Sequence, residues 1–215
     1  MAYKLAIDGP AGSGKSTIAK ILAENNNLTF FSTGFLFRAF ALILIENNFL
    51  NQSEIKIVEL LKKNKISYQN GRLLVNDVCV DQNIKTEKIS SLASSLATKK
   101  NIRNLYNEIV QKMIMELDVV LEGRDIGTII MPNANLKIYL TASIIERAKR
   151  RKKEFDDLKI KSNFLKIWFN IFWRDFKDKH RKIAPLKKAK DAIVIKTNNK
   201  NINAVVNEIQ QYIKK

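Results

Sequence analysis

Cysteine is nearly absent from this chain, and so is any long uninterrupted apolar run. Cys79 is the only cysteine among 215 residues, so no internal disulfide can form, which suits a reducing compartment. The most apolar stretch, residues 35–50, contains Arg38 and Glu46 and is too short and too charged to span a bilayer. The first four residues run directly into an apolar segment, so we expect no secretory signal and a cytoplasmic location.

Acidic residues are also in short supply. The chain has 21 Asp and Glu against 38 Lys and Arg, which gives a net charge of +17. Such a charge indicates either a polyanionic partner, such as RNA or an acidic membrane, or a composition that is rich in lysine throughout. Because the lysines are scattered along the chain, we favour the compositional explanation and expect neither a nucleic acid nor a membrane partner. The positive field would still attract small phosphorylated substrates.

Residues 9–16 read Gly-Pro-Ala-Gly-Ser-Gly-Lys-Ser and match the phosphate-binding P-loop pattern, Gly-x4-Gly-Lys-[Ser/Thr]. The context fits as well, because the loop follows a short apolar strand and opens an amphipathic helix. Glycines allow backbone angles at which successive N–H groups point into one anion-binding concavity, and the helix N-terminus adds positive partial charge. Lys15 would then reach the β- and γ-phosphates of a nucleoside triphosphate, and the Ser16 hydroxyl would bind Mg²⁺.

Strand and helix patterns alternate along most of the chain, which predicts an α/β fold with a central parallel sheet flanked by helices. The phosphate site would lie at the carboxyl end of the first strand. Residues 66–86 interrupt the alternation, because Asn70-Gly71 between two short apolar runs predicts a hairpin in a small antiparallel insert. Ser143 and Glu146 form a capping box that opens a later helix. The predicted strands are residues 4–8, 28–31, 66–69, 72–75, 78–80, 119–121, 136–140 and 192–195, and the predicted helices are 15–25, 35–47, 53–64, 87–98, 102–117 and 202–213.

Two short segments at predicted strand ends suit a phosphate acceptor. Thr33, a glycine and Arg38 follow the second strand, and a guanidinium offers two parallel donors to phosphate oxygens. Residues 122–127 read Glu-Gly-Arg-Asp-Ile-Gly and leave the strand at residues 119–121, at the sheet edge that faces the ligand crevice in open α/β folds. Both segments are therefore candidates for the second substrate of a phosphoryl transfer.

Arginines gather between residues 147 and 181. Phosphoryl transfer depends mostly on positioning and on stabilising charge, and mobile arginines that close over the phosphates supply both while excluding water. The members of this segment whose spacing suits one site are Arg174, Asp175, Asp178 and Arg181.

Together these segments resemble the bacterial-type cytidylate kinases, which are P-loop nucleoside monophosphate kinases. The resemblance covers nearly the whole chain, and two of its elements are far more specific in combination than the glycine loop. These elements are Gly-Arg-Asp-Ile-Gly-Thr at residues 123–128 and Ala-Pro-Leu at residues 184–186. Further matches are residues 7–17, 33–38, 93–94, 102–103, 132–134, 140–148, 174–181 and 191–195.

The resemblance implies a role for each matching residue. The cytosine edge would be read by Thr33, Arg103, Asp125 and Arg181, the ribose hydroxyls would be held by Ser94, Arg174 and Asp178, and the acceptor phosphate would be bound by Arg38 and Arg124. ATP would be bound by Gly9, Pro10, Ala11, Gly12, Ser13, Gly14, Lys15, Ser16 and Thr17, together with Arg147 and Arg151, and Ser16 would hold the metal. The catalytic charges would come from Lys15, Arg124, Arg174 and Arg181.

The resemblance also implies how one kinase unit, residues 1–215, is divided. We expect a core of residues 1–32, 99–145 and 183–215, a substrate-binding part of residues 33–98 that carries the insert at 66–86, and a helical lid of residues 146–182. A monomer is the expected state.

Some positions depart from the family pattern. Thr33 stands where serine is common, and Phe37 replaces a usual tyrosine. His180 is the only histidine, but we do not expect it to be a catalytic base, because kinases of this type need none. Residues 164–173 are unusually apolar and aromatic, and we expect them to pack on the core or against themselves rather than on a membrane.

The sequence therefore predicts an enzyme that transfers the γ-phosphate of ATP, with Mg²⁺, to CMP or dCMP. One alternative is a small P-loop kinase with another acceptor, such as UMP, AMP, dTMP or shikimate. A second is a basic RNA-binding NTPase module, for which only residues 147–182 offer charges interleaved with aromatics.

Overall fold

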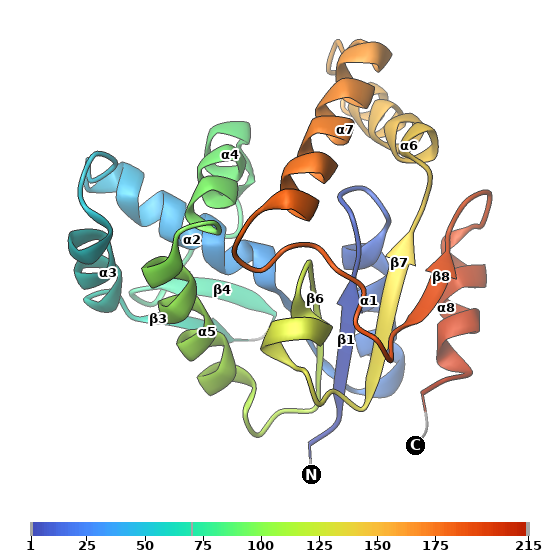
Figure 1. Cartoon of the computed structure of the whole chain (residues 1–215), viewed down its shortest axis with the longest axis horizontal. Coiled ribbons are helices and arrows are strands. Elements are labelled where there is room, and N and C mark those ends of the chain that lie inside the picture. The colour runs from blue at the N-terminus through green and yellow to red at the C-terminus, as the bar shows by residue number, and fades with distance from the viewer. Residues whose placement is uncertain (1, 70, 214–215) are drawn as a thin grey trace. The chain divides into compact units, whose positions relative to one another are not determined.

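The computed structural model describes residues 2–69 and 71–213, without the side chain of Lys85. The chain forms two compact units (Figure 1). Unit 1 contains Phe31–Leu117 with the start of the chain, and unit 2 contains Tyr3–Phe30 and Asp118–Lys215. The predicted division into core, substrate-binding part and lid stays a prediction. Among the described residues, no helix is both long enough and apolar enough to cross a bilayer.

Unit 2 is built on a sheet with the strand order β2-β6-β1-β7-β8. The central strand β1 (Lys4–Asp8) pairs in parallel with β6 (Val119–Gly123) and β7 (Leu136–Thr141), and β7 pairs in parallel with β8 (Ile193–Lys196). The edge strand β2 (Thr29–Ser32) leaves unit 2 after Phe30. Asp8 lies opposite Gly123 in the register, so the P-loop and the Gly-Arg-Asp loop leave neighbouring strands at the same level.

Two helices of unit 2 bury one apolar face of this sheet. α1 (Lys15–Asn26) and α8 (Ile202–Gln210) share a core with β1 to which Ile7, Leu22 and Val205 contribute, all of them fully buried. Truncating a leucine in such a core to alanine costs about 2–5 kcal/mol. The π-helical segment η2 (Ile126–Ile130) follows β6. The predicted fold class, a parallel sheet flanked by helices with a small antiparallel insert, is confirmed.

Two further helices of unit 2, α6 (Ile144–Asp157) and α7 (Phe164–His180), lie side by side (Figure 1). Half of the predicted capping box is present, because the Ser143 hydroxyl accepts the Glu146 N–H at 3.2 Å. The reciprocal bond is replaced, since the Ser143 N–H donates to Asn198 at 3.3 Å and the Glu146 carboxylate pairs with Arg150. Residues 164–173 were expected to pack on the core or against themselves. Packing on the core is wrong for much of the run, whereas Trp168 and Phe172 do stack on each other. Ile167 is buried, but Leu165, Phe169, Phe172 and Trp173 are exposed, because the inner face of α7 is occupied by Ile167 and charged residues.

Unit 1 consists of helices and the antiparallel sheet β3-β4-β5. β3 (Ile66–Gln69) and β4 (Arg72–Val75) pair so that Gln69 lies opposite Arg72, and β5 (Val78–Cys79) continues the sheet. Gly71 has a φ of 76°, which explains the glycine of the turn, whereas Asn70 lies outside the described residues. The helices of the unit are α2 (Thr33–Glu46), α3 (Glu54–Lys62), η1 (Asn83–Lys85), α4 (Glu87–Leu96) and α5 (Lys100–Ile114).

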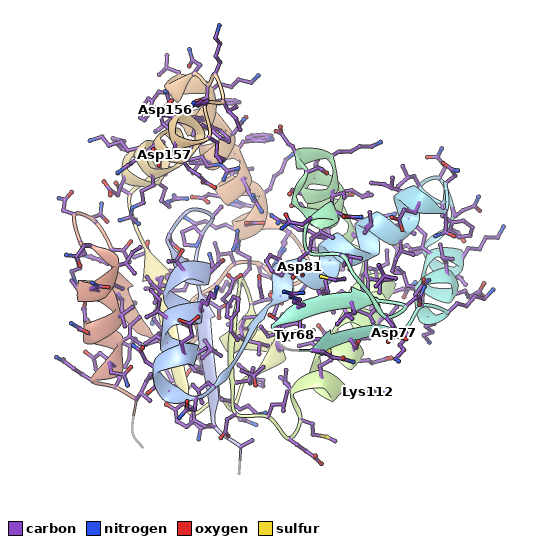
Figure 2. The ribbon with its side chains drawn as sticks, turned by 180° about the vertical axis from the view of Figure 1, so that it is seen from behind. Tyr68, Asp77, Asp81, Lys112, Asp156 and Asp157 are labelled. Carbon is purple, nitrogen blue, oxygen red and sulfur yellow. The ribbon has the colours of Figure 1, made fainter. Side chains whose placement is uncertain are left out.

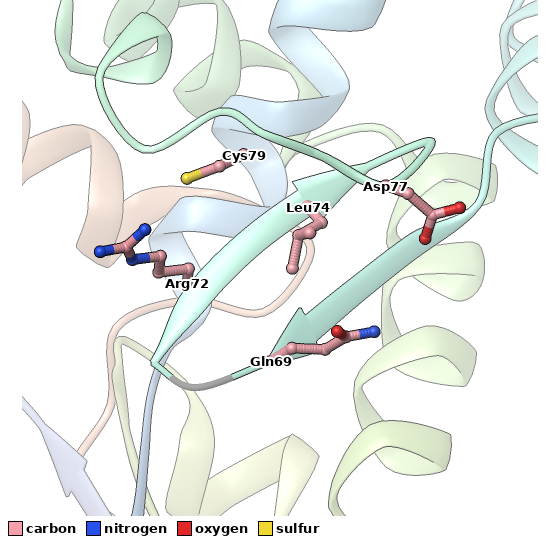
Figure 3. Close-up of a pocket in the computed structure, with 5 residues that line it drawn as sticks. All are labelled: Gln69, Arg72, Leu74, Asp77 and Cys79. Carbon is pink, nitrogen blue, oxygen red and sulfur yellow. The ribbon is translucent and has the colours of Figure 1, made fainter.

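A cavity of about 420 Å³ lies on the small sheet, away from the predicted motifs. Its lining residues are Gln69, Arg72, Leu74, Asp77 and Cys79 (Figure 3). On the same sheet, burial and the nearby carboxylate of Asp81 raise the pKa of Tyr68 to about 12, so this phenol stays protonated at physiological pH (Figure 2).

Candidate active site

The P-loop of unit 2 has a backbone that only glycine accommodates at several positions. Gly12 and Gly14 have φ values of 74° and 89°, in the left-handed region. A side chain at Gly9 would place its Cβ 2.1 Å from the carbonyl oxygen of Leu140, so β7 leaves no room for one. Gly14 is also the N-cap of α1, which places the positive end of that helix at the loop.

Lys15 is buried and lies against its own loop. Its ammonium donates a hydrogen bond to the carbonyl of Pro10 at 2.8 Å. Burial, together with the positive charges of Arg124 and Arg174, lowers the pKa of Lys15 to about 7, although Glu122 and Asp8 oppose the shift. A phosphate group bound at this point would replace the missing counter-charge and keep the lysine protonated.

Next to this lysine, Ser16 and Glu122 form a small oxygen-rich pair. The Ser16 hydroxyl donates to a Glu122 carboxylate oxygen at 3.1 Å. A hydroxyl and a carboxylate, with several water molecules and substrate phosphates, are the ligands that Mg²⁺ prefers in kinases. The donor set therefore fits the predicted metal, and the role of Ser16 as its direct ligand stays a prediction.

Asp8, at the end of β1, binds the backbone of the loop that follows β6. Its two carboxylate oxygens accept the backbone N–H groups of Ile126 and Gly127, each at 2.8 Å. Burial raises the pKa of Asp8 to about 6; these two hydrogen bonds oppose the shift, and the Asp125 charge adds to it. Space at Gly127 is limited, because a Cβ would lie 3.2 Å from a side-chain carbon of Lys137 and 3.4 Å from the Asp8 carboxylate. Asp8 thus fixes the loop that carries Arg124 and Asp125.

Helix α7 meets that loop through a series of ion pairs. Asp178 accepts a hydrogen bond from Arg124 Nε at 2.9 Å, and a guanidinium nitrogen of Arg181 lies 3.6 Å from Asp125. Arg181 also donates to the carbonyl of Ala184 at 2.5 Å, and the Leu186 N–H donates a hydrogen bond to the Asp178 carbonyl at 2.7 Å. The Ala-Pro-Leu element therefore folds back on the end of α7 and orients Arg181. Four predicted substrate residues of unit 2, Arg124, Asp125, Asp178 and Arg181, are brought together in this way.

Arg147 links the P-loop to the same helix. Its guanidinium donates to the carbonyl of Ala142 at 3.0 Å and of Ala11 at 2.9 Å, and it pairs with Asp175 through two hydrogen bonds. Both partners are almost fully buried. By contrast, Arg151 is half-exposed and pairs with Glu154. Arg174 is exposed, and its charge contributes to the lowered pKa of Lys15.

Unit 1 carries the remaining predicted substrate residues. Thr33 is buried at the start of α2, and Arg38 is half-buried one turn later. Ser94 is exposed on α4, where its hydroxyl donates to the Ser90 carbonyl at 3.1 Å. These positions agree with a polar binding surface, and their roles stay predictions.

Arg103 of α5 lies in an aromatic setting that the sequence did not reveal. Its guanidinium carbon is 4.8 Å from the centre of the Phe37 ring and 5.3 Å from that of Tyr106, and the two rings stack on each other. One nitrogen donates to the Ala97 carbonyl at 3.1 Å. A phenylalanine at position 37 therefore loses a hydroxyl but keeps the face that supports Arg103. The signal available in the sequence was Tyr106, which follows Arg103 by three residues and so lies on the same face of the helix.

Comparisons with known proteins agree with this site. A family model described as cytidylate kinase matches residues 5–215. The chain is 41% identical to a cytidylate kinase of Thermosipho melanesiensis, over 100% of this chain and 98% of that protein. It is also 41% identical to a cytidylate kinase of Fusobacterium nucleatum, over 98% and 97% of the two chains.

The solved structures add agreement at the level of the fold. The shikimate kinase of Bacteroides thetaiotaomicron superposes with a TM-score of 0.50 at 13% identity, over 97% of this chain and 96% of that one. This likeness concerns the fold alone, whereas the sequence comparisons extend to the substrate motifs. The chain therefore belongs to the cytidylate kinase family, as the combination of the P-loop, the Gly-Arg-Asp loop and the Ala-Pro-Leu element predicted.

Proposed function

We propose that this chain transfers the γ-phosphate of ATP to CMP or dCMP and releases ADP with CDP or dCDP. The observation that carries the proposal is the cluster in unit 2 in which the P-loop lysine, Lys15, is buried within electrostatic reach of Arg124 and Arg174. A phosphate donor site and the arginines of the acceptor motifs thus belong to one charged environment. Family membership supports this acceptor over shikimate or an RNA ligand.

The reaction needs charge neutralisation more than covalent chemistry. An oxygen of the acceptor phosphate attacks the γ-phosphorus in line, the bond to the β-phosphate oxygen breaks, and ADP leaves with that electron pair. Lys15 would bind the β- and γ-phosphates, and Arg38 and Arg124 would bind the acceptor phosphate. Arg174 and Arg181 would stabilise the equatorial charge. Ser16, with Glu122 beside it, would hold Mg²⁺, which would supply further charge neutralisation when bound.

Recognition of the acceptor would use side chains that already have partners. The ion pair with Asp178 leaves other guanidinium N–H groups of Arg124 for a phosphate, and the pair between Asp125 and Arg181 presents acceptor and donor side by side to a base edge. Thr33 and Arg103 would complete the contacts to cytosine. Ser94, Arg174 and Asp178 would hold the ribose hydroxyls. We further propose Arg147 and Arg151 as lid residues over ATP, action as a monomer, and a cytoplasmic location.

An ADP-release assay with ATP and Mg²⁺ tests the proposal against CMP, dCMP, UMP, AMP, dTMP and shikimate. We expect fast turnover with CMP and dCMP, weak turnover with UMP and none with the other acceptors. Preference for another acceptor would replace cytidine nucleotides as the substrate. Absence of turnover with every acceptor, together with salt-sensitive RNA binding, would discard the kinase proposal.

A further inference from the structure

The outward face of α7 is a continuous aromatic surface. Leu165, Phe169, Phe172, Trp173 and Phe176 follow one another at intervals of four, three, one and three residues, which places them on one side of the helix. Their side chains are between 41% and 72% exposed. We call these five residues the aromatic face. Their combined exposed surface is on the order of 400 Å², comparable to the largest apolar patch of a typical monomer.

Three of the four rings of this face stack on a neighbouring ring of the same helix. Trp173 and Phe176 stack with their centroids 5.5 Å apart, and Phe172 stacks on the neighbouring Trp168 at 5.7 Å. Stacked rings lose little side-chain freedom when something binds over them, because they are already ordered. The aromatic face is thus a preformed binding surface.

The opposite side of α7 faces the candidate active site and carries its ion pairs. Asp175 is buried against Arg147, and Asp178 accepts from Arg124. The two acidic residues of the helix therefore point inward, away from the aromatic face. Substitutions on that face remove no partner of these ion pairs, so the surface can be tested independently of them.

Lysines border the aromatic face. Lys166, Lys177 and Lys179 lie on the exposed part of the helix, and the ammonium of Lys177 is 5.6 Å from the centre of the Trp173 ring. Between residues 146 and 182 the chain carries fourteen Lys and Arg against six Asp and Glu. Of the acidic residues, Asp156 and Asp157 lie near the end of α6, and Asp156 is paired with Lys152 (Figure 2).

The connection between α6 and α7 extends this surface along the chain. Leu158 and Ile160 are 63% and 47% exposed, and they alternate with Lys159 and Lys161. Apolar residues with adjacent lysines thus continue from the connection into the first turn of α7.

We propose that the aromatic face of α7 docks on an anionic lipid surface. Aromatic and leucine side chains can enter the headgroup boundary, while bordering lysines attract acidic headgroups. A second copy of this chain fits the charge less well, because pairing two such faces would bring their lysines together. The proposal does not rest on the phosphoryl-transfer function.

Both tryptophans of the chain, Trp168 and Trp173, lie on α7, so intrinsic fluorescence reports on this helix alone. The full chain is mixed with vesicles of phosphatidylglycerol and phosphatidylcholine, or of phosphatidylcholine alone, and is examined by sedimentation and emission spectra. We expect co-sedimentation and a blue shift with the anionic vesicles, both weakened by salt. Absence of binding to the anionic vesicles would overturn the proposal.

Variants separate apolar docking from charge alone. Phe169→Ser/Phe172→Ser/Phe176→Ser keeps both tryptophans, and we expect it to reduce vesicle binding at least about tenfold with the same circular dichroism spectrum. The matched control, Ile55→Ser/Val78→Ser/Met115→Ser, removes three exposed apolar side chains elsewhere and should bind as the unmodified chain does. Equal binding by both variants would show that scattered lysines, not the aromatic face, attract lipid. Concentration-dependent dimers that the phenylalanine variant abolishes would assign the face to self-association and overturn the lipid proposal.

Discussion

At the scale of single residues, burial of Lys15 destabilises the folded chain but places an ammonium group where a phosphate can bind. Its pKa is about 7 in the folded chain and about 10.5 in an unfolded one. The unfolded chain therefore binds more protons between these values, and the contribution of Lys15 to stability rises with pH over that window. Below pH 7 the folded chain carries a buried, poorly compensated charge.

We therefore expect Lys15→Met to raise the melting temperature of the nucleotide-free protein at pH 7 by a few degrees, since at least about 1 kcal/mol of destabilisation is removed. The same variant should lose roughly 10³-fold in kcat. Differential scanning calorimetry and the ADP-release assay measure the two effects. Lys20→Met, at an exposed position of the same helix, is the control and should change neither. A lower melting temperature for Lys15→Met would contradict the assignment of a buried, costly charge.

Asp8 gives a second prediction at this scale. Its pKa is raised to about 6, so its favourable contribution to folding is present below about pH 4 and is lost as the pH rises through 6. Protonation of Asp8 has a separate, local effect: a neutral carboxyl group is a weaker acceptor for one of the two N–H groups of Ile126 and Gly127. Asp8→Asn mimics the protonated form, and we expect it to raise KM for CMP roughly tenfold through the displaced loop of Arg124 and Asp125.

The measurement is a pH profile of kcat/KM for CMP. Unmodified protein should lose activity below about pH 6, partly because CMP itself titrates there, while Asp8→Asn should show a shallower acid limb from a lower plateau. Identical profiles for the two proteins would mean that Asp8 does not position the loop.

At the scale of elements, the strands and helices were largely readable from the sequence, whereas the pairing of charges was not. The alternation of patterns predicted the parallel sheet, and Ser143 with Glu146 predicted the start of α6. Asp175 and Arg147 lie 28 residues apart, and no local pattern joins them. The outward position of Phe169 was also missed. The ion pairs of Asp175 and Asp178 decide which side of α7 faces inward, and those pairs could not be read from the sequence.

The link between α6 and α7 has a measurable energetic consequence. Removing one partner of a buried ion pair leaves an uncompensated charge and typically costs about 3–5 kcal/mol. We expect Asp175→Asn to lower the free energy of unfolding by about that amount in urea denaturation, and Arg147→Met/Asp175→Leu to recover most of it. Glu154→Gln breaks the exposed pair with Arg151 and should change stability by less than about 1 kcal/mol. Equal losses for Asp175→Asn and Glu154→Gln would show that burial of the first pair is unimportant.

At the scale of the whole molecule, the net charge of +17 would attract nucleotide substrates, because these are anions. The composition alone left RNA, a membrane and a lysine-rich background open, because scattered charge specifies no partner. The motifs resolve the substrate class, since Lys15, Arg38 and Arg124 are placed by elements that the family pattern defines. Apart from the lysines that border the aromatic face of α7, the remaining lysines contribute to a positive field rather than to specific contacts.

That field should appear in the kinetics. Both substrates are anions, so long-range attraction raises their local concentration, and screening removes this gain. We expect kcat/KM for CMP to fall at least about threefold when the salt concentration rises from about 0.05 M to about 0.5 M, a change that shortens the Debye length several-fold. The value of kcat at saturating substrates should change less than about twofold, because the bound phosphates are shielded from bulk ions. Steady-state assays at a fixed Mg²⁺ concentration across the salt series measure kcat/KM and kcat separately. A kcat that falls in parallel with kcat/KM would place the salt effect in the bound complex, and the net charge would then have no steering role.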